Sequence, residues 1–214
     1  EEGAGRLREL AGRLSRKRNE AAKKLALQVT KELSALRMDR IGFTVKVSSL
    51  SDETAYGPTG QDAVEFMFSA NPGEPLKPLA RVASGGELSR VMLALKTILA
   101  ESDHVPVLIF DEVDAGVGGA VAEVMGMRLR DLGCHHQVFC VTHLPQVGSQ
   151  AHAHYLVEKQ VRQKRTVTQV RLLTSSEREE EIARMLAGVT VTKGARAAAA
   201  EMIGGVKGKR SGPD

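Results

Sequence analysis

Two adjacent carboxylates stand where an apolar segment of this 214-residue chain ends. Residues 105–110 form a continuous apolar run, and Asp111-Glu112 follow directly, with Asp114 and a glycine-rich stretch over 115–119. Adjacent side chains that leave a buried strand point in different directions, so one carboxylate could ligate Mg²⁺ while the other polarises a water molecule. The alternative is structural, since an aspartate commonly begins a turn after a strand. The pair alone does not decide between these interpretations.

A second candidate is the segment Ser84-Gly85-Gly86-Glu87, which begins a predicted helix. Ser84 and Glu87 have the spacing of a capping box, in which each side chain satisfies a backbone amide of the other residue. Two glycines in a first helical turn destabilise a helix by roughly 1 kcal/mol each relative to alanine, so capping alone does not explain them. They leave backbone amides uncovered at the positive end of the helix dipole, which favours phosphate binding.

The third candidate is His143, which follows the apolar run 138–141. A single histidine is more often structural than catalytic, but this one follows a strand just as Asp111 does. Ligands of doubly wound sheets bind beyond the carboxyl ends of the parallel strands. We therefore expect His143 and the Asp111-Glu112 pair at the same edge of one sheet.

The elements that must hold these residues alternate between apolar strands and amphipathic helices. A helical pattern precedes each apolar run, over residues 88–99 and 121–132. This alternation predicts an α/β fold with a mostly parallel sheet covered on both faces. Two earlier segments, 41–47 and 64–68, alternate with period two and predict antiparallel strands. The remaining expected elements are a hairpin over 154–158 and 166–172, and helices over 176–186 and 195–202.

The first part of the chain predicts a long helix. No proline occurs over residues 6–37, and leucine, alanine and valine recur there at spacings of three, four and seven residues. A narrow apolar seam with basic flanks is typical of a coiled-coil arm, although a plain amphipathic helix gives a similar pattern. No second heptad segment of matching length is found, so a partner helix would come from elsewhere. We expect an arm helix over 1–38, a head unit over 39–203 and a frayed basic tail over 204–214.

The formal net charge of +4 is unevenly distributed. Residues 1–31 carry nine basic and four acidic side chains, and residues 203–214 carry three and one, so the rest of the chain is net acidic. Basic clusters hold phosphate backbones without sequence preference, which makes Arg16, Lys17 and Arg18 candidate DNA contacts. The alternative is a solvated helix face. An aromatic content of 3% disfavours recognition by base stacking.

The composition also excludes some protein classes. No apolar run approaches the roughly 20 residues that cross a bilayer, and the charged start is neither a signal nor a transit peptide. We expect a cytoplasmic protein with no membrane partner. Cys134 and Cys140 are too few for a disulfide scaffold, and Cys140 lies in an apolar run where a small buried side chain is expected.

The ordered combination of the three candidate segments resembles the ATP-binding cassette ATPases, whose P-loop NTPase-like heads carry a signature loop, a Walker B strand and a switch histidine. Asp111 follows Ser84 by 27 residues, and His143 follows after a further 32. Longer stretches are similar to an SMC-like branch of this superfamily that acts in DNA repair, over residues 71–74, 79–90, 110–119 and 141–147. In that branch the head is split into N- and C-terminal halves joined by a coiled-coil arm. The resemblance identifies this chain as a C-terminal half-head preceded by part of the arm.

The resemblance implies a role for each candidate residue, with ATP and Mg²⁺ as cofactors. Residues Ser84 to Glu87 would form the signature loop, which contacts the γ-phosphate of ATP held by a second head in a homodimer. Asp111 would be the Walker B carboxylate near Mg²⁺, and Glu112 the general base for the attacking water. Asp114 would belong to the ATP-binding loop that links the two heads, and His143 would be the switch residue near the γ-phosphate.

One part of an ATPase head is missing from the sequence. The chain contains no G-x-x-x-x-G-K-[ST] segment, and the nearest fragment, over 204–211, has the wrong spacing. The resemblance therefore implies ATP hydrolysis only with an N-terminal half that carries this loop, acting with DNA in recombinational repair of double-strand breaks, at the nucleoid. The alternative is a non-catalytic cassette-fold module that binds DNA or acts as a scaffold. Glu112 beside Asp111 disfavours it, because a site without turnover needs no base.

Overall fold

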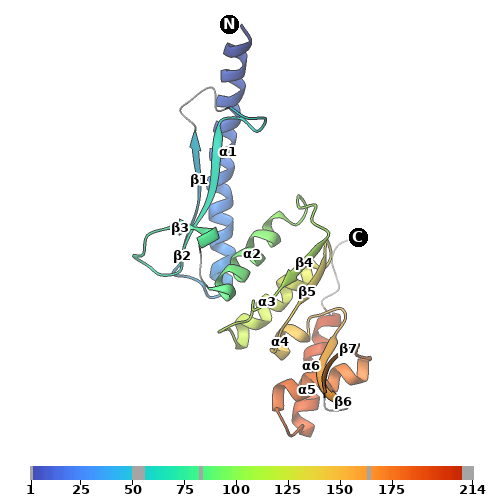
Figure 1. Cartoon of the computed structure of the whole chain (residues 1–214). Helices are drawn as coiled ribbons and strands as arrows, with labels where there is room; N and C mark the ends of the chain where they lie inside the picture. Colours follow the sequence, from blue (N-terminus) through green and yellow to red (C-terminus); the bar gives the residue numbers. More distant parts are fainter. Residues whose placement is uncertain (1, 50–55, 82–83, 163–164, 209–214) are drawn as a thin grey trace. The chain divides into compact units, whose positions relative to one another are not determined.

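The computed structural model of the chain describes residues 2–49, 56–81, 84–162 and 165–208 (Figure 1). The chain divides into two compact units, Glu1–Leu99 and Ala100–Asp214, which we describe one at a time. Across these described ranges, no helix combines the length and the apolarity that a bilayer crossing requires.

Unit 1 (Glu1–Leu99) is a long helix packed along a small antiparallel sheet (Figure 1). Its elements are α1 (Glu2–Ala35), β1 (Gly42–Ser49), β2 (Asp62–Ser69), β3 (Lys77–Pro78), the 3₁₀ turn η2 (Leu79–Arg81) and α2 (Gly85–Leu99). β1 and β2 pair along their full lengths, with Phe43 opposite Phe68. The two alternating segments of the sequence are therefore confirmed as antiparallel strands.

The C-terminal half of α1 belongs to the core of unit 1. Val29 and Leu33 are fully buried, and they cluster with Phe43 and Phe68 of the sheet and with Val91 of α2. The apolar residues follow the helical period on α1 and period two on the strands, so each element turns one apolar face inward.

The N-terminal half of α1 has Ala11 buried, but its leucines are less covered by the described residues of unit 1 than Val29 and Leu33 are. Leu7, Leu10 and Leu14 are exposed. The predicted long helix is confirmed, and these exposed leucines keep the pattern expected of an arm. The compact units divide after Leu99, and the second half of α1 shares its core with the sheet. The predicted boundary between arm and head at residue 38 stays a prediction.

Unit 2 (Ala100–Asp214) contains a parallel strand pair, an antiparallel hairpin and a pair of packed helices. Its elements are β4 (Val107–Phe110), α3 (Gly119–Leu132), β5 (Gln137–Cys140), α4 (Pro145–Gly148), β6 (Tyr155–Arg162), β7 (Arg165–Leu172), α5 (Ser175–Ala187) and α6 (Lys193–Gly208). β4 and β5 are parallel, with Phe110 opposite Cys140, and β6 pairs antiparallel with β7. The predicted alternation of strands and helices and the predicted hairpin are confirmed.

The described residues of unit 2 cover one face of the parallel pair and leave the other exposed. Leu108 and Phe110 are buried, and α3 packs against β5. On the opposite face, the side chain of Ile109 is 73% exposed and that of Phe139 is 45% exposed. The sequence predicts a sheet covered on both faces, so the uncovered face is a difference from that expectation.

Helices α5 and α6 pack around a small core of Ile182, Ala183, Ala199 and Ile203. α6 continues to Gly208, with Val206 buried, whereas the sequence predicts a frayed tail from Gly204. That expectation is wrong for residues 204–208, because Val206 extends the helical spacing of Ala199 and Ile203. Residues 209–214 of the predicted tail lie outside the described residues.

Candidate functional site

The carboxylate pair lies at the carboxyl end of β4. The amide of Val141 donates a hydrogen bond to the carbonyl of Phe110 (3.0 Å), so the parallel pairing reaches the residue directly before Asp111. Asp111 and Glu112 are both exposed. Oδ1 of Asp111 accepts a hydrogen bond from the amide of Glu112 (2.9 Å), and Glu112 has a φ of 56°. A left-handed backbone at a non-glycine residue costs of order 1–3 kcal/mol, and such strain clusters at functional sites.

Asp114 is buried and connects the loop after β4 to the loop after β5. Its Oδ2 accepts hydrogen bonds from Oγ1 of Thr142 (2.6 Å) and from the amide of His143 (3.2 Å). Nδ1 of His143 lies 3.4 Å from the same oxygen, while the His143 side chain is 77% exposed. The structure thus brings the residues that follow the two strands to one edge, as the sequence predicts. Their catalytic roles stay predictions.

The charges of nearby carboxylates affect the pKa of the Cys140 thiol. Burial, followed by the charges of Asp114 and Asp111, raises the pKa of the Cys140 thiol to about 12. The thiol therefore stays protonated at neutral pH and is no candidate nucleophile. The same negative potential favours a bound cation beside Asp111.

The donor set beside β4 fits Mg²⁺ in its chemistry. Carboxylate oxygens are the hard ligands that Mg²⁺ prefers, and Mg²⁺ is usually held by one or two carboxylates together with water and substrate phosphates. Among the residues that the structure describes, no group of three or more His, Cys, Asp or Glu side chains is arranged as a metal cage.

Arg178 and Arg130 hold the short helix after His143, although neither belongs to a sequence motif. Nη2 of Arg178 in α5 donates to the carbonyls of Gly148 (3.3 Å) and Ser149 (2.7 Å). Nη1 of Arg130 in α3 donates to the carbonyl of Gln150 (3.2 Å). These bonds reach carbonyls at the end of α4, where a helix leaves its last carbonyls without helical partners, and the Gly148 carbonyl also accepts a bond from the amide of Ala151 (3.3 Å). Their acceptors are backbone atoms brought together by tertiary packing, so the sequence carries no signal for them.

In unit 1, the segment Ser84 to Glu87 leads into α2 as predicted. Oγ of Ser84 accepts a hydrogen bond from the amide of Glu87 (3.4 Å), and its carbonyl accepts one from the amide of Leu88 (3.1 Å). Ser84 therefore caps the helix. Ser84 and Gly85 are exposed and Gly86 is buried. Capping is confirmed, whereas phosphate binding by these amides stays a prediction.

The three candidate DNA contacts on α1 differ in their surroundings. Arg16 and Lys17 are exposed. Arg18 is partly buried, with Nη1 3.1 Å from Oδ2 of Asp62 and with Nη2 donating to the carbonyl of Thr59 (2.7 Å). Arg18 therefore fastens α1 to the start of β2, which leaves Arg16 and Lys17 as the cations of this group that face solvent.

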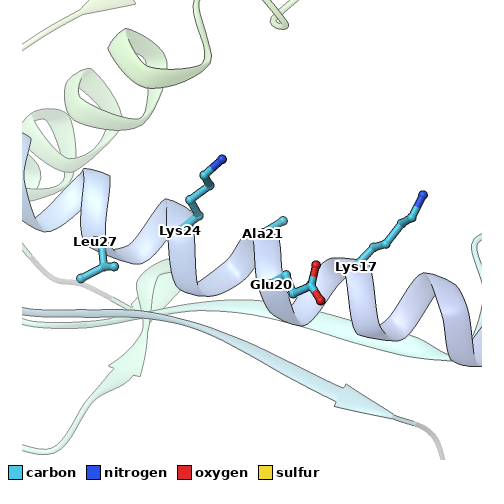
Figure 2. Close-up of a pocket in the computed structure, with 5 residues that line it drawn as sticks. All are labelled: Lys17, Glu20, Ala21, Lys24 and Leu27. Carbon is cyan, nitrogen blue, oxygen red and sulfur yellow. The ribbon is translucent and has the colours of Figure 1, made fainter.

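Lys17 also belongs to an open hollow along the exposed side of α1, which is lined by Lys17, Glu20, Ala21, Lys24 and Leu27. Figure 2 shows the side chains of Lys17 and Lys24 extending from the helix in the same direction. Seven residues of α-helix span about 10 Å, so both ammonium groups could contact one phosphate backbone.

Comparisons with known proteins place these features in a family context. No family model matches the chain. The DNA repair protein RecN of Xylella fastidiosa (strain 9a5c) is 44% identical over 196 residues, which are 92% of this chain and 35% of that protein. RecN of Bacillus subtilis (strain 168) is 41% identical over 205 residues, or 90% of this chain and 36% of that protein. The chain thus spans about a third of the length of the curated relatives it matches.

A solved structure supports the fold. The crystal structure of the Smc head domain with a coiled coil and joint derived from Pyrococcus yayanosii covers 78% of this chain, with a TM-score of 0.53 and 17% identity. The match covers 29% of that structure's own chain. The α/β head fold predicted from the sequence is thereby confirmed, and at this identity the likeness concerns the fold alone.

Proposed function

We propose that this chain, a homologue of the RecN DNA repair proteins over about nine tenths of its length, supplies part of an SMC-type ATPase head that hydrolyses ATP in DNA repair. One observation carries the proposal. The carboxylates after β4 and the histidine after β5 meet at one edge of a parallel strand pair. Phosphoryl transfer depends on positioning and charge neutralisation, which groups at this edge can supply.

Each residue of this edge has a proposed role. Asp111 would hold Mg²⁺, which when bound neutralises charge on the phosphates of ATP. Glu112 would accept the proton of the attacking water, and its exposed side chain is open to that water. The exposed imidazole of His143 would contact the γ-phosphate. Asp114 would belong to the loop that links two heads.

The segment Ser84 to Glu87 would serve a second head in a homodimer. Its exposed Ser84 and Gly85 stand at the start of the 15-residue helix α2, where the helix dipole is positive. The amides there would contact the γ-phosphate of ATP bound by the partner head. This role is separate from the capping that Ser84 provides to α2.

An N-terminal half of the same head would complete the site. The uncovered face of β4 and β5 carries Val107, Ile109, Phe139 and Val141, all exposed within unit 2. A contiguous apolar face of this kind is typical of a surface that another segment covers. We propose that the N-terminal half, with its phosphate-cradling loop, covers this face, and that ATP hydrolysis requires it.

The test of the base assignment is ATP hydrolysis by this chain combined with an N-terminal half that carries a G-x-x-x-x-G-K-[ST] loop. Glu112→Gln should lower kcat by about 10²- to 10⁴-fold while ATP binding is kept, because a general base typically contributes that much. Glu201→Gln, an exposed acid on α6, serves as the matched control and should leave kcat unchanged. Unchanged turnover in Glu112→Gln would favour the non-catalytic module instead.

The basic side of α1 is proposed to contact DNA, in a protein that acts in the cytoplasm at the nucleoid. The substitutions Arg16→Glu and Lys17→Glu should weaken DNA binding and reduce its salt dependence, because fewer counterions are released. Arg18 is left unchanged in this test, since it pairs with Asp62 inside unit 1. The control is Lys46→Glu, at an exposed lysine of β1. Equal affinities in all variants would place the DNA surface elsewhere.

A further inference from the structure

Thr142 lies between the buried Asp114 and the backbone that carries His143. Its Oγ1 lies 2.6 Å from Oδ2 of Asp114 and accepts a hydrogen bond from the amide of Leu144 (3.0 Å). Because an ionised carboxylate only accepts hydrogen bonds, the hydroxyl must be the donor to Asp114. The Thr142 hydroxyl therefore uses its donor and one acceptor site inside this loop.

The same two residues hold the backbone on both sides of His143. The amide of His143 donates to Oδ2 of Asp114 (3.2 Å), and the amide of Leu144 donates to Thr142. The His143 side chain itself is 77% exposed, so packing constrains its direction little. The direction of the imidazole is therefore set by the backbone that these bonds fix, together with the contact of its Nδ1 with Oδ2 of Asp114 (3.4 Å).

The bond between Thr142 and Asp114 has the features of a strong one. Its 2.6 Å length falls in the range of O–H···O⁻ bonds, which are roughly twice as strong as neutral ones. Asp114 is buried, and a low local dielectric strengthens the bond further. Beyond the loop, Arg130 and Arg178 bind carbonyls at the end of α4. The segment from Thr142 to Gln150 is thus fastened at both ends.

We propose that Thr142 is a positioning residue, which acts through Asp114 and the two amides to hold His143 at the edge of the sheet where Asp111 and Glu112 lie. The consequence for catalysis rests on the proposed function. The positioning itself does not, because the hydrogen bonds from which it is argued join residues of unit 2.

Amide hydrogen exchange in the full chain tests the positioning without nucleotide. Thr142→Val keeps the shape and removes the hydroxyl, so exchange at His143 and Leu144 should become roughly 10- to 100-fold faster, the range expected for losing a hydrogen bond to a charged group. Thr142→Ser keeps the hydroxyl and should stay within about threefold of the unsubstituted chain. Thr97→Val, which loses a hydroxyl bond to the carbonyl of Leu93 in unit 1, is the matched control.

Two results of this experiment would overturn the proposal. One is unchanged exchange at His143 and Leu144 in Thr142→Val, and the other is equally fast exchange in Thr142→Ser. Asp114→Asn replaces the charged acceptor with a neutral one and should accelerate exchange at the same amides. It gives the answer if the valine variant does not fold.

ATP hydrolysis by the chain completed with its N-terminal half then tests the consequence. Thr142→Val should lower kcat about 10-fold or more with KM for ATP nearly unchanged, and Thr142→Ser should restore it, since a misplaced group affects the chemical step. Faster exchange with unchanged kcat would overturn a positioning role in catalysis. If the unsubstituted chain hydrolyses no ATP even when its N-terminal half is present, the proposed function is refuted instead. The exchange data would still decide whether Thr142 holds the loop.

Discussion

Replacing Leu33 by alanine should destabilise unit 1 by about 3–5 kcal/mol, because a buried leucine truncated to alanine leaves a cavity as well as losing its transfer free energy. Leu33 is fully buried and clusters with Val29, Phe43 and Phe68. A site enclosed by a helix and a sheet cannot readily collapse, so the upper part of the usual range, about 2–5 kcal/mol, is expected. The better helix propensity of alanine offsets only a few tenths of a kcal/mol.

Urea unfolding followed by far-UV circular dichroism measures this effect, since α1 is a 34-residue helix. With a urea slope of about 1–3 kcal/mol per M, the midpoint should fall by roughly 1–5 M. Leu27→Ala is the control in the same helix, because Leu27 is 74% exposed and its loss should cost less than about 0.5 kcal/mol. If Leu33→Ala shifts the midpoint as little as Leu27→Ala does, the assignment of Leu33 to the core of unit 1 is wrong, and α1 is an independent arm.

Three further predictions concern unit 2. Gly126→Ala should destabilise the packing of α3 on α4 by about 1–3 kcal/mol in the same unfolding assay, because an added Cβ would lie 3.0 Å from the carbonyl oxygen of Gln146 and 3.2 Å from Cα of Val147. Gly204→Ala in α6, with no atom within 4 Å of the new Cβ, should be neutral or stabilising. Hydrogen bonds from the amide and hydroxyl of Thr174, then from Arg171, lower the pKa of Glu177 from 4.5 to about 2. Its stabilising contribution at the start of α5 is present above pH 4.5 and lost as the pH falls towards 2. The NMR amide shifts of the unsubstituted chain should show this acid transition, and those of Glu177→Gln should lack it. Iodoacetamide at pH 8 should alkylate the exposed Cys134 but not Cys140, whose pKa of about 12 keeps the thiol protonated, and mass spectrometry that finds Cys140 modified in the folded chain would contradict this.

The elements of the fold were largely predictable because local patterning determines them. Period-two alternation over 41–47 and 64–68 identified β1 and β2, and apolar runs identified β4 and β5. The surface on which α1 packs was not predictable. Val29 and Leu33 have the spacing of a coiled-coil seam whether they face another helix or a sheet, so the pattern cannot name the partner. The uncovered face of β4 and β5 was also missed, since apolar runs predict burial without stating which segment provides it.

The candidate site was predictable in its location but not in its bonding. The rule that ligands bind at the carboxyl ends of parallel strands placed Asp111 and His143 together. Nothing in the sequence indicated that Asp114 accepts hydrogen bonds from Thr142 and His143, because residues 28 and 29 positions apart meet only when both strands are in register. The φ of 56° at Glu112 was likewise unpredictable, since glutamate has no preference for that conformation.

The burial of Asp114 also constrains how its loop could link two heads. The Asp114 side chain is 5% exposed, and its Oδ2 already serves Thr142 and His143. A contact from a second head that broke those bonds would leave a buried carboxylate short of partners, at a cost of several kcal/mol. The residues that follow, Ala115 and Gly116, are exposed. Any contact between heads at this loop is therefore expected from Ala115 and Gly116, while Asp114 keeps His143 in place behind them.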